Sequence, residues 1–411
     1  MLDPYSPDSI SDPVSLWARL REEAPVFEVP GSDRHFLISR YADVRRVCEN
    51  FEVFSNELLA SVQRGADGRP RLLSAPSKGS PQGRVIGAAD GEIHRRQRRL
   101  LAPAFSARRM KLFEEWLRLQ AQELLHARSE EFDVMRELAE PLPVQAMAHL
   151  LGLPSEDWQR LFNWSESAME LIGGLAEPAS FATLYGDIEA LQAYLGEHID
   201  LEGPRRSIDP TDRASDAGGV IRLVSDAVAA GTLEMWEASG LLFQLVVAGS
   251  DTTVGLIGAA IRRLAEESPR AELLREDRAK IGPFIEETLR LDGPAIGNYR
   301  RATCETELGG VRIPEGATLT LLWGSANRDA SEFPDPDVFD PSRPNLKGHL
   351  AFGHGTHFCL GASLARLEAR VAIETTLDSA NAIELACASD DLRGVRSLFI
   401  RKLEALPVRA R

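Results

Sequence analysis

Closely spaced cysteines are the first feature that this sequence lacks. Its four cysteines, Cys48, Cys304, Cys359 and Cys387, are scattered over 411 residues, and none belongs to a C-x-x-C pair. This distribution does not match a disulfide framework and is typical of proteins from a reducing compartment. We therefore expect a cytoplasmic protein without disulfide bonds.

A surplus of positive charge is also missing. The formal net charge is −15 at pH 7. Because like charges repel at a distance, a general affinity for nucleic acid or for anionic lipid is not expected. Any partner of that kind would need a local basic patch.

Long uninterrupted apolar runs are absent as well. The most apolar segment, residues 241–260, contains Gln244 and Asp251, which predicts a buried core helix and not a membrane span. The first 17 residues hold three aspartates and several prolines but no basic start, so neither a secretory signal nor a membrane anchor is predicted. We expect a soluble monomer.

Helical periodicity is what the sequence has in quantity. Hydrophobic residues make up 44% of the chain and charged residues 27%, which is ample for a sizeable core. Short strands are expected over residues 26–29, 36–38 and 311–313 and in a hairpin near the C-terminus. Helical spacing of apolar residues predicts helices over 13–23, 41–49, 106–126, 143–151, 155–172, 179–198 and 231–268.

One cysteine lies in a distinctive loop. Gly353 and Gly355 precede Cys359 at a two-residue spacing, which permits a tight turn with positive φ, and Gly361 lets another group approach the backbone closely. A helix is expected directly after Gly361, so its unpaired N–H groups and dipole favour a thiolate at Cys359 and make it a good iron ligand.

Two other interpretations of this cysteine stay open at this point. A single cysteine is often no more than a small buried hydrophobic residue. A zinc site could instead use His349, His354, His357 and Cys359, although structural zinc usually takes paired ligands from two elements.

The whole loop, Phe352-Gly353-His354-Gly355-Thr356-His357-Phe358-Cys359-Leu360-Gly361, resembles the haem-binding motif F-G-x-G-x-H-x-C-x-G of the cytochrome P-450 monooxygenases. The resemblance implies a haem b (iron protoporphyrin IX) bound at Phe352, His357, Cys359 and Gly361, with Cys359 as the axial thiolate and His357 close to a propionate. Thiolate ligation favours O–O cleavage.

The same resemblance extends over nearly the full chain. It implies a mainly α fold with a small β-rich part, in which the haem lies between a long central helix and the helix after the cysteine loop. We therefore predict one catalytic domain over residues 1–411.

Basic residues dominate the segment from His94 to Lys111. His94 and Arg98 are four residues apart and share one helical face, and H-x-x-x-R here resembles the family's pair that grips the haem propionates. The resemblance also assigns Arg300 to a propionate, although Arg301 beside it leaves the choice of arginine open. The remaining cations form either a solvated face or a docking site for an acidic electron donor.

The predicted long helix has an unusual centre, because Ala248-Gly249-Ser250-Asp251-Thr252-Thr253 places polar residues between apolar flanks. One explanation is structural, since a threonine can bond to a carbonyl one turn earlier and bend the helix. The segment also resembles the family's A/G-G-x-D/E-T signature. The resemblance places Ala248 against the haem, lets Thr252 contact bound dioxygen and makes Asp251 a proton relay.

A pocket for a hydrophobic molecule, with a terpenoid or a steroid as the guess, is suggested by apolar residues near these motifs. Residues 61–91 are rich in Gly and Pro, and in the family a loop at this position covers the substrate. The candidate lining residues are Val85, Ile86, Val247, Ala248, Ala295, Ile296, Phe399 and Ile400.

Three further residues are predicted to be structural. Glu287 and Arg290 are three apart on a helix and can pair. In the family such a pair joins a third residue, here Arg343, behind the haem.

The activity implied by the resemblance is hydroxylation with O2 and two electrons. No nicotinamide or flavin fingerprint is present, so we expect a ferredoxin and a ferredoxin reductase as electron donors. A peroxide-driven enzyme, a donor-independent isomerase or dehydratase and a non-catalytic haem sensor are the alternatives.

Overall fold

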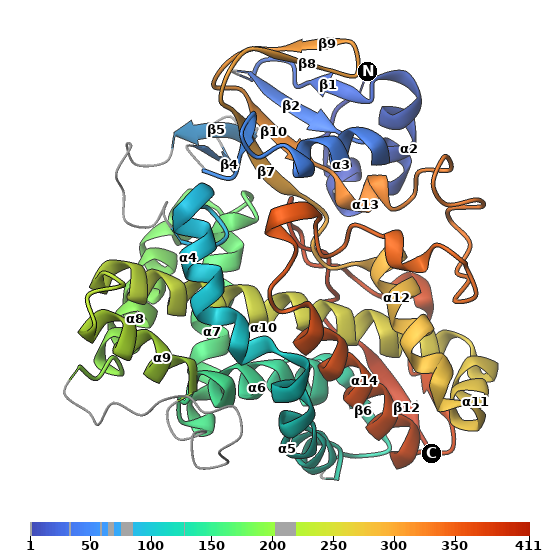
Figure 1. Cartoon of the computed structure of the whole chain (residues 1–411). Coiled ribbons are helices and arrows are strands. Elements are labelled where there is room, and N and C mark those ends of the chain that lie inside the picture. Colours follow the sequence, from blue (N-terminus) through green and yellow to red (C-terminus); the bar gives the residue numbers. More distant parts are fainter. Residues whose placement is uncertain are drawn as a thin grey trace.

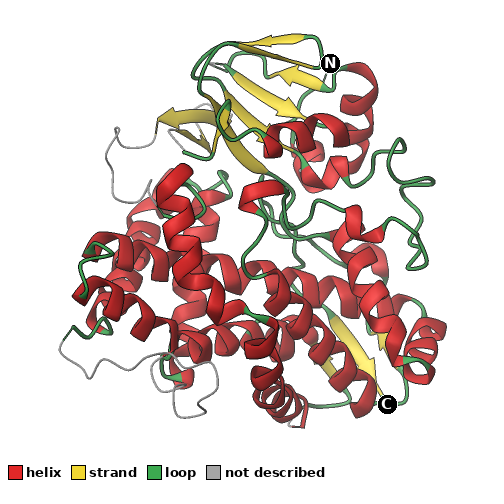
Figure 2. Ribbon diagram, viewed as in Figure 1, coloured by secondary structure: helices red, strands yellow, loops and turns green. Residues whose placement is uncertain are grey.

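The computed structural model describes residues 2–32, 34–57, 60–64, 70–74, 85–126, 128–201 and 219–411. Helices form the larger part of the molecule, most strands gather near the N-terminus, and a few lie near the C-terminus (Figure 2). The N-terminal part contains the helices α1 (Pro7–Ser11), α2 (Val14–Glu23) and α3 (Tyr41–Glu49). The short helix α13 (Trp323–Ala326) lies before the cysteine loop. The larger helical part contains α4 (Gly91–Leu101), α5 (Ala107–His126), α6 (Pro141–Leu151), α7 (Trp158–Ile172), α8 (Phe181–Glu197), α9 (Gly219–Ala229), α10 (Met235–Glu266), α11 (Ser268–Glu276), α12 (Ile281–Asp292) and α14 (Ala362–Ser379).

Helix α10 runs through the middle of the helical part (Figure 1). It begins with a capping box between Glu234 and Glu237, which satisfies N–H groups that the first turn leaves free. Its length and hydropathy would suffice to cross a membrane, but 67% of its most apolar window is buried inside the protein. It is therefore the buried core helix that the sequence predicts.

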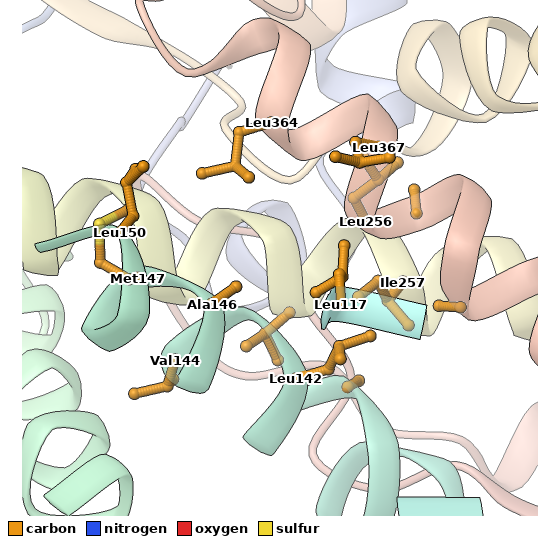
Figure 3. Close-up of a cluster of buried hydrophobic side chains, with 14 of the residues drawn as sticks. Leu117, Leu142, Val144, Ala146, Met147, Leu150, Leu256, Ile257, Leu364 and Leu367 are labelled. Atoms are coloured by element: carbon orange, nitrogen blue, oxygen red, sulfur yellow. The ribbon is translucent and has the colours of Figure 1, made fainter. Parts of the chain in front are cut away.

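The main core is built around α10. Leu256 and Ile257 of α10 lie among leucines of three other helices, Leu117 of α5, Leu142 of α6 and Leu364 of α14 (Figure 3). Such close packing between helices distant in the chain fixes α10 and α14 relative to each other.

The largest sheet has five strands in the order β1-β2-β10-β7-β3. All pairs are antiparallel except β2 with β10, which is parallel. The strands are β1 (Val26–Glu28), β2 (His35–Ile38), β3 (Phe54–Ser55), β7 (Asn298–Ala302) and β10 (Thr318–Leu321). This sheet places Arg300 on β7, opposite Leu319 of β10.

The described residues form three smaller sheets besides this one. A hairpin joins β8 (Thr306–Leu308) to β9 (Val311–Ile313), and a three-stranded sheet has the order β11-β12-β6. The strands of the latter are β6 (Glu131–Asp133), β11 (Ile383–Leu385) and β12 (Pro407–Ala410). The expected hairpin near Phe399 consists only of two isolated bridges, Ala295 with Ile400 and Gly394 with Leu403.

Part of the segment predicted as an irregular loop is a hairpin, with β4 (Ala60–Arg64) paired to β5 (Pro70–Ser74). The glycines at 65 and 68 fall between the two strands, and Pro70 stands at the first position of β5, where a missing N–H is tolerated. Residues 65–69 and 75–84 lie outside the described residues.

Candidate active site

The cysteine loop has the conformation that its glycines predict. Gly353 and Gly355 have φ of 70° and 71°, in the left-handed region. The Cys359 N–H donates to the Phe352 carbonyl at 2.9 Å, which closes the loop. Gly361 has φ of −82°, and a Cβ there would lie 3.9 Å from the Cys359 Sγ, so positive φ is not its reason for being glycine.

The Cys359 side chain is exposed and lies at the start of α14, where its sulfur accepts hydrogen bonds from the N–H groups of Gly361 and Ala362. Burial of the thiol among surrounding protein atoms nevertheless raises its pKa. The two N–H groups and the positive charges of Arg98 and Arg366 act in the opposite direction but do not outweigh it. The predicted geometry is present, and the two N–H groups act to lower the pKa of Cys359 as the sequence predicts, although desolvation of the thiol outweighs them in the protein alone.

The zinc alternative is wrong in the part of the chain that the structure describes, where no three His, Cys, Asp or Glu side chains could share a metal. Each histidine of that proposal contacts a different carboxylate. His349 lies 3.1 Å from Glu286, His354 lies 3.0 Å from Glu49 and His357 lies 3.1 Å from Asp90.

Three cationic or basic side chains near this loop have no carboxylate partner among the described residues. His94 is 1% exposed, neither ring nitrogen has a hydrogen-bond partner, and its ring centroid lies 4.1 Å from that of His357. Arg98, four residues along α4, makes no ion pair there, and its charge reaches Cys359. Burial lowers the pKa of His94 to about 4.

Arg300 is the third of these side chains. It is 4% exposed and donates to the Tyr299 carbonyl at 2.6 Å and to Cys48, and burial lowers its pKa. Arg301 points to the other side of β7, where it pairs with Glu57 at 3.5 Å. The two neighbouring arginines are therefore distinguished by their surroundings, and Arg300 is the buried one.

Asp90 is a site residue that the sequence reasoning missed. It immediately precedes α4 and accepts hydrogen bonds from the Ser55 hydroxyl at 2.6 Å and the Asn56 N–H at 2.9 Å, besides contacting His357. Burial acts to raise the pKa of Asp90, but these hydrogen bonds outweigh it and lower the pKa. An acid just before a predicted helix was the one available signal.

These residues fit a haem. Buried nitrogen donors normally have partners, and His94, Arg98 and Arg300 together match a group that carries carboxylates. The single sulfur of Cys359, held by two backbone N–H groups, matches one axial ligand to its iron.

The middle of α10 has a solvent-exposed position. Ala248 is exposed, although Val246 and Val247 before it and Ser250 and Asp251 after it are buried. The Thr252 hydroxyl donates to the Ala248 carbonyl at 2.8 Å, so the bonding of a threonine to the preceding turn, considered from the sequence, is present.

Asp251 is buried and forms an ion pair with Lys402, which also pairs with Glu166 of α7. Lys402 is 151 residues from Asp251 along the chain, and Glu166 is 236 residues from Lys402. No local sequence pattern therefore predicts either contact. Glu368 of α14 was missed as well. It is buried beside Thr253, and burial raises its pKa well above the ordinary value.

The candidate pocket residues are only partly brought together. Ala295 bridges to Ile400, and the Ile296 N–H donates to the Phe399 carbonyl at 3.1 Å. The side chain of Ile296, however, packs in the cluster of Leu16 and Trp17 at the N-terminus. Val85 and Ile86 are buried in the main core, as is Val247, and Val85 lies against Gly240 of α10.

Glu287, Arg290 and Arg343 form the predicted cluster. Arg290 donates to both Glu287 oxygens at 2.7 Å, and Arg343 donates to the Glu287 Oε1 at 3.1 Å. All three are buried, so the cluster fixes α12 to the segment before the cysteine loop.

Comparison with known proteins decides the family. A family model described as cytochrome P-450 matches residues 282–380. Cytochrome P-450 144 of Mycobacterium tuberculosis is 32% identical over 406 residues, which are 98% of this chain and 90% of that protein. This chain belongs to the cytochrome P-450 family. Vitamin D(3) 25-hydroxylase of Pseudonocardia autotrophica is 33% identical over 410 residues, 99% of this chain and 96% of that cytochrome P-450.

A solved structure agrees. The structure of CYP109E1 from Bacillus megaterium in complex with testosterone superimposes on this chain with a TM-score of 0.81 and is 28% identical in sequence. The match covers 98% of this chain and 99% of that one. Cytochromes P-450 carry haem, so the chain is a haem-dependent monooxygenase with the mainly α fold predicted from its motifs.

Proposed function

We propose that Cys359 is the iron ligand of this monooxygenase, and that its substrate is a hydrophobic small molecule of steroid or terpenoid type. The observation that carries the proposal is the cysteine loop, in which two glycines with positive φ present one exposed sulfur at the start of α14. When bound, the haem supplies the iron that activates dioxygen. The chain's own residues orient it, deliver protons and shape the pocket.

His94, Arg98 and Arg300 hold the two propionates in this proposal, with His357 beside them. Support comes from their lack of carboxylate partners among the described residues and from the burial of His94 and Arg300. Charge-assisted hydrogen bonds to a carboxylate are stronger than neutral ones, and in a buried setting they offset the desolvation of these side chains. Phe352 and Gly361, at either end of the cysteine loop, would help to hold the haem.

Asp251 and Thr252 would hold and pass protons at the exposed face of α10. Support comes from their adjacency at the open side of α10, where Ala248 is exposed. A hydroxyl already bonded to a carbonyl on its own helix keeps its oxygen lone pairs for a further donor, so Thr252 can accept a proton-bearing group and pass its own proton on.

The substrate class follows from the relatives and the lining residues. One relative hydroxylates vitamin D(3) by its name, and one structure holds testosterone. Val247, Ala295, Phe399 and Ile400 would give this chain an apolar wall. The Gln244 amide, which accepts the Gly87 N–H at 3.0 Å, adds a polar group one turn before Ala248.

Electrons come from a ferredoxin and its reductase, in a soluble, cytoplasmic, monomeric protein whose whole length forms one catalytic unit. Among the remaining cations between His94 and Lys111, Arg95 and Arg96 already pair with Glu92 and Glu237. Arg99 and Arg108 are exposed without a carboxylate partner in the described part of the chain, and they are the better candidates.

One experiment separates this function from the alternatives. A hydrophobic compound library is screened for spin-state shifts of the ferric protein, and each hit is incubated in three reactions: with NADPH, ferredoxin and reductase, with peroxide alone, and without any oxidant. Hydroxylated product only in the first reaction supports the proposal. Product from peroxide alone, product without any oxidant, or binding without turnover would instead identify a peroxide-driven enzyme, an isomerase or a sensor.

A further inference from the structure

Lys402 occupies an unusual position for a lysine. Its side chain is 6% exposed, and its ammonium contacts Asp251 of α10 and Glu166 of α7 at once. Lys402 itself belongs to neither helix, since it lies in the segment just before β12. Three distant parts of the chain therefore meet at one ammonium group.

Exposure rises step by step across this cluster. The Asp251 side chain is 3% exposed, whereas that of Glu166 is 37% exposed. A cavity of about 360 Å³ between α7 and residues 395–402 is lined by all three residues and by Ser167 and Ser397. A space of this size, with carboxylates, an ammonium and hydroxyls among its lining groups, holds several water molecules.

We propose that Lys402 is a positioning residue for proton delivery, holding Asp251 against this cavity, and that Glu166 is the point at which protons enter from solvent. The proposal rests on the proposed role of Asp251. Lys402 and Glu166 both lie outside the motif around Asp251, and the cavity beside them supplies the water from which protons are taken up.

The charges of the cluster suit this role. One ammonium between two carboxylates leaves a net negative charge, which favours uptake of one proton. Burial and the nearby Asp251 raise the pKa of Glu166 to about 7, despite the opposing effect of Lys402. Burial acts to lower the pKa of Lys402, but Asp251 and Glu166 outweigh it and raise the pKa, so Lys402 stays charged.

The two acids meet at the same ammonium group. Asp251 acts on the Glu166 carboxyl both through its charge and as a hydrogen-bond partner, and a hydrogen bond between two carboxyl groups requires one proton. One proton from solvent binds Glu166, passes to Asp251 and leaves toward Thr252, after which both carboxylates have regained their charge. Lys402 keeps its three protons throughout.

Other ionisable groups surround the cluster. Burial raises the pKa of Glu140, at the start of α6. The charge of Lys402 acts to lower this pKa, and the charge of Asp251 acts to raise it. Asp133 also acts to raise the pKa of Glu140, whereas Arg136 acts to lower it. Glu170, Glu177 and Arg396 line the cavity, and the Phe162 ring lies 5.8 Å from the Lys402 ammonium. None of these contacts bridges Asp251 to solvent as Glu166 does.

The test compares Glu166→Gln with Glu170→Gln. Both glutamates are on α7 and line the cavity, but Glu170 makes no ion pair among the described residues. Difference infrared spectra should show a protonated carboxyl that titrates near pH 7 in the unaltered protein and in Glu170→Gln but is absent in Glu166→Gln. In turnover, Glu166→Gln should lower product formed per NADPH about tenfold and flatten its pH dependence near pH 7.

Lys402 is tested by Lys402→Met and Lys402→Arg. The methionine variant should lose coupling and move the infrared titration to higher pH, while arginine should restore most of both because it keeps the charge. If Glu166→Gln retains normal coupling, pH dependence and carboxyl titration, the inference is overturned, whatever its stability. The reduced carbon monoxide spectrum of each variant is recorded alongside, so that loss of haem ligation, which would contradict the proposed function instead, is recognised separately.

Discussion

Basic side chains that are buried without a carboxylate partner among the described residues are the most informative residues of this protein. A guanidinium as enclosed as that of Arg300 normally faces an acid, because an unpaired buried charge is costly. Here its described partners are a carbonyl and a thiol, and its pKa is lowered by burial. A ligand carboxylate would relieve that cost, so Arg300 should contribute more to haem binding than to the fold.

Replacement of Arg300 by Met should therefore weaken haem binding about ten- to a hundredfold, since a hydrogen bond to a charged group contributes about 1.5–3 kcal/mol. The rate of haem transfer to an acceptor protein measures this. Arg301→Met is the matched control, because Arg301 pairs with Glu57 near the surface. Equal haem loss in the two variants would contradict the assignment of Arg300.

Replacement of Thr252 by Ala should divert reducing equivalents to hydrogen peroxide while haem stays bound. Positioned proton transfer contributes about 10²–10⁴-fold in rate, so product formed per NADPH should fall at least about tenfold. Thr252→Ser, which keeps the hydroxyl, should stay close to the unaltered enzyme. Unchanged coupling in Thr252→Ala would remove this residue from the mechanism and leave its bond to Ala248 as a purely structural feature.

Elements are where sequence reasoning was most accurate. The helices α2, α3 and α5 to α8 lie where apolar periodicity placed them, and the left-handed glycines of the cysteine loop follow from their spacing before Cys359. The hairpin of β4 and β5 was missed because its strands have few apolar residues and a Gly-rich connection. Contacts such as Lys402 with Asp251 were missed because they join segments with no local pattern in common.

Helices α12 and α14 are joined by an ion pair whose strength depends on pH. Glu286 accepts two hydrogen bonds from Arg366, at 2.6 and 2.8 Å, and lies 3.1 Å from His349. Burial acts to raise the pKa of Glu286, but these partners outweigh it and lower the pKa from 4.5 to about 2. Because the folded pKa is the lower one, the resulting stability is present above pH 4.5 and is lost as pH falls toward 2.

Glu286→Gln should accordingly lower the free energy of unfolding at pH 7 by about 3 kcal/mol, from 1.36 kcal/mol for each pKa unit. It should also reduce the loss of stability between pH 4.5 and 2. Denaturant unfolding across this range measures both effects. Glu272→Gln on the exposed face of α11 serves as control, and an identical pH dependence in both variants would refute the role of Glu286.

At the scale of the whole molecule, charge is distributed unevenly. The net charge is −15, yet basic side chains are exposed in one region. Helix α4, which carries His94 and Arg98, exposes Arg99, and the start of α5 exposes Arg108. Motif order along the chain, from the H-x-x-x-R helix to the cysteine loop, was enough to predict the fold of the whole molecule. The identity of the substrate was not predictable, because the pocket is assembled from single apolar residues of separate segments.

Reversal of both exposed charges, Arg99→Glu with Arg108→Glu, should slow reduction by an acidic ferredoxin about tenfold at low ionic strength, because complementary charge raises association rates. The difference should shrink as salt screens it. Arg312→Glu, on the distant β8–β9 hairpin, is compared with each single reversal, Arg99→Glu and Arg108→Glu, as the control for an equal change of net charge (Figure 1). Equal reduction rates at every salt concentration would place the donor elsewhere.

Ligation of the haem iron by Cys359 is the claim on which the account depends, and the reduced carbon monoxide complex tests it most directly. The unaltered protein and Cys304→Ala, which removes another exposed cysteine, should both show the red-shifted Soret band of a thiolate-ligated haem. Cys359→Ala should lack this band even if haem is retained. Persistence of the band in Cys359→Ala would show that a different residue ligates the iron.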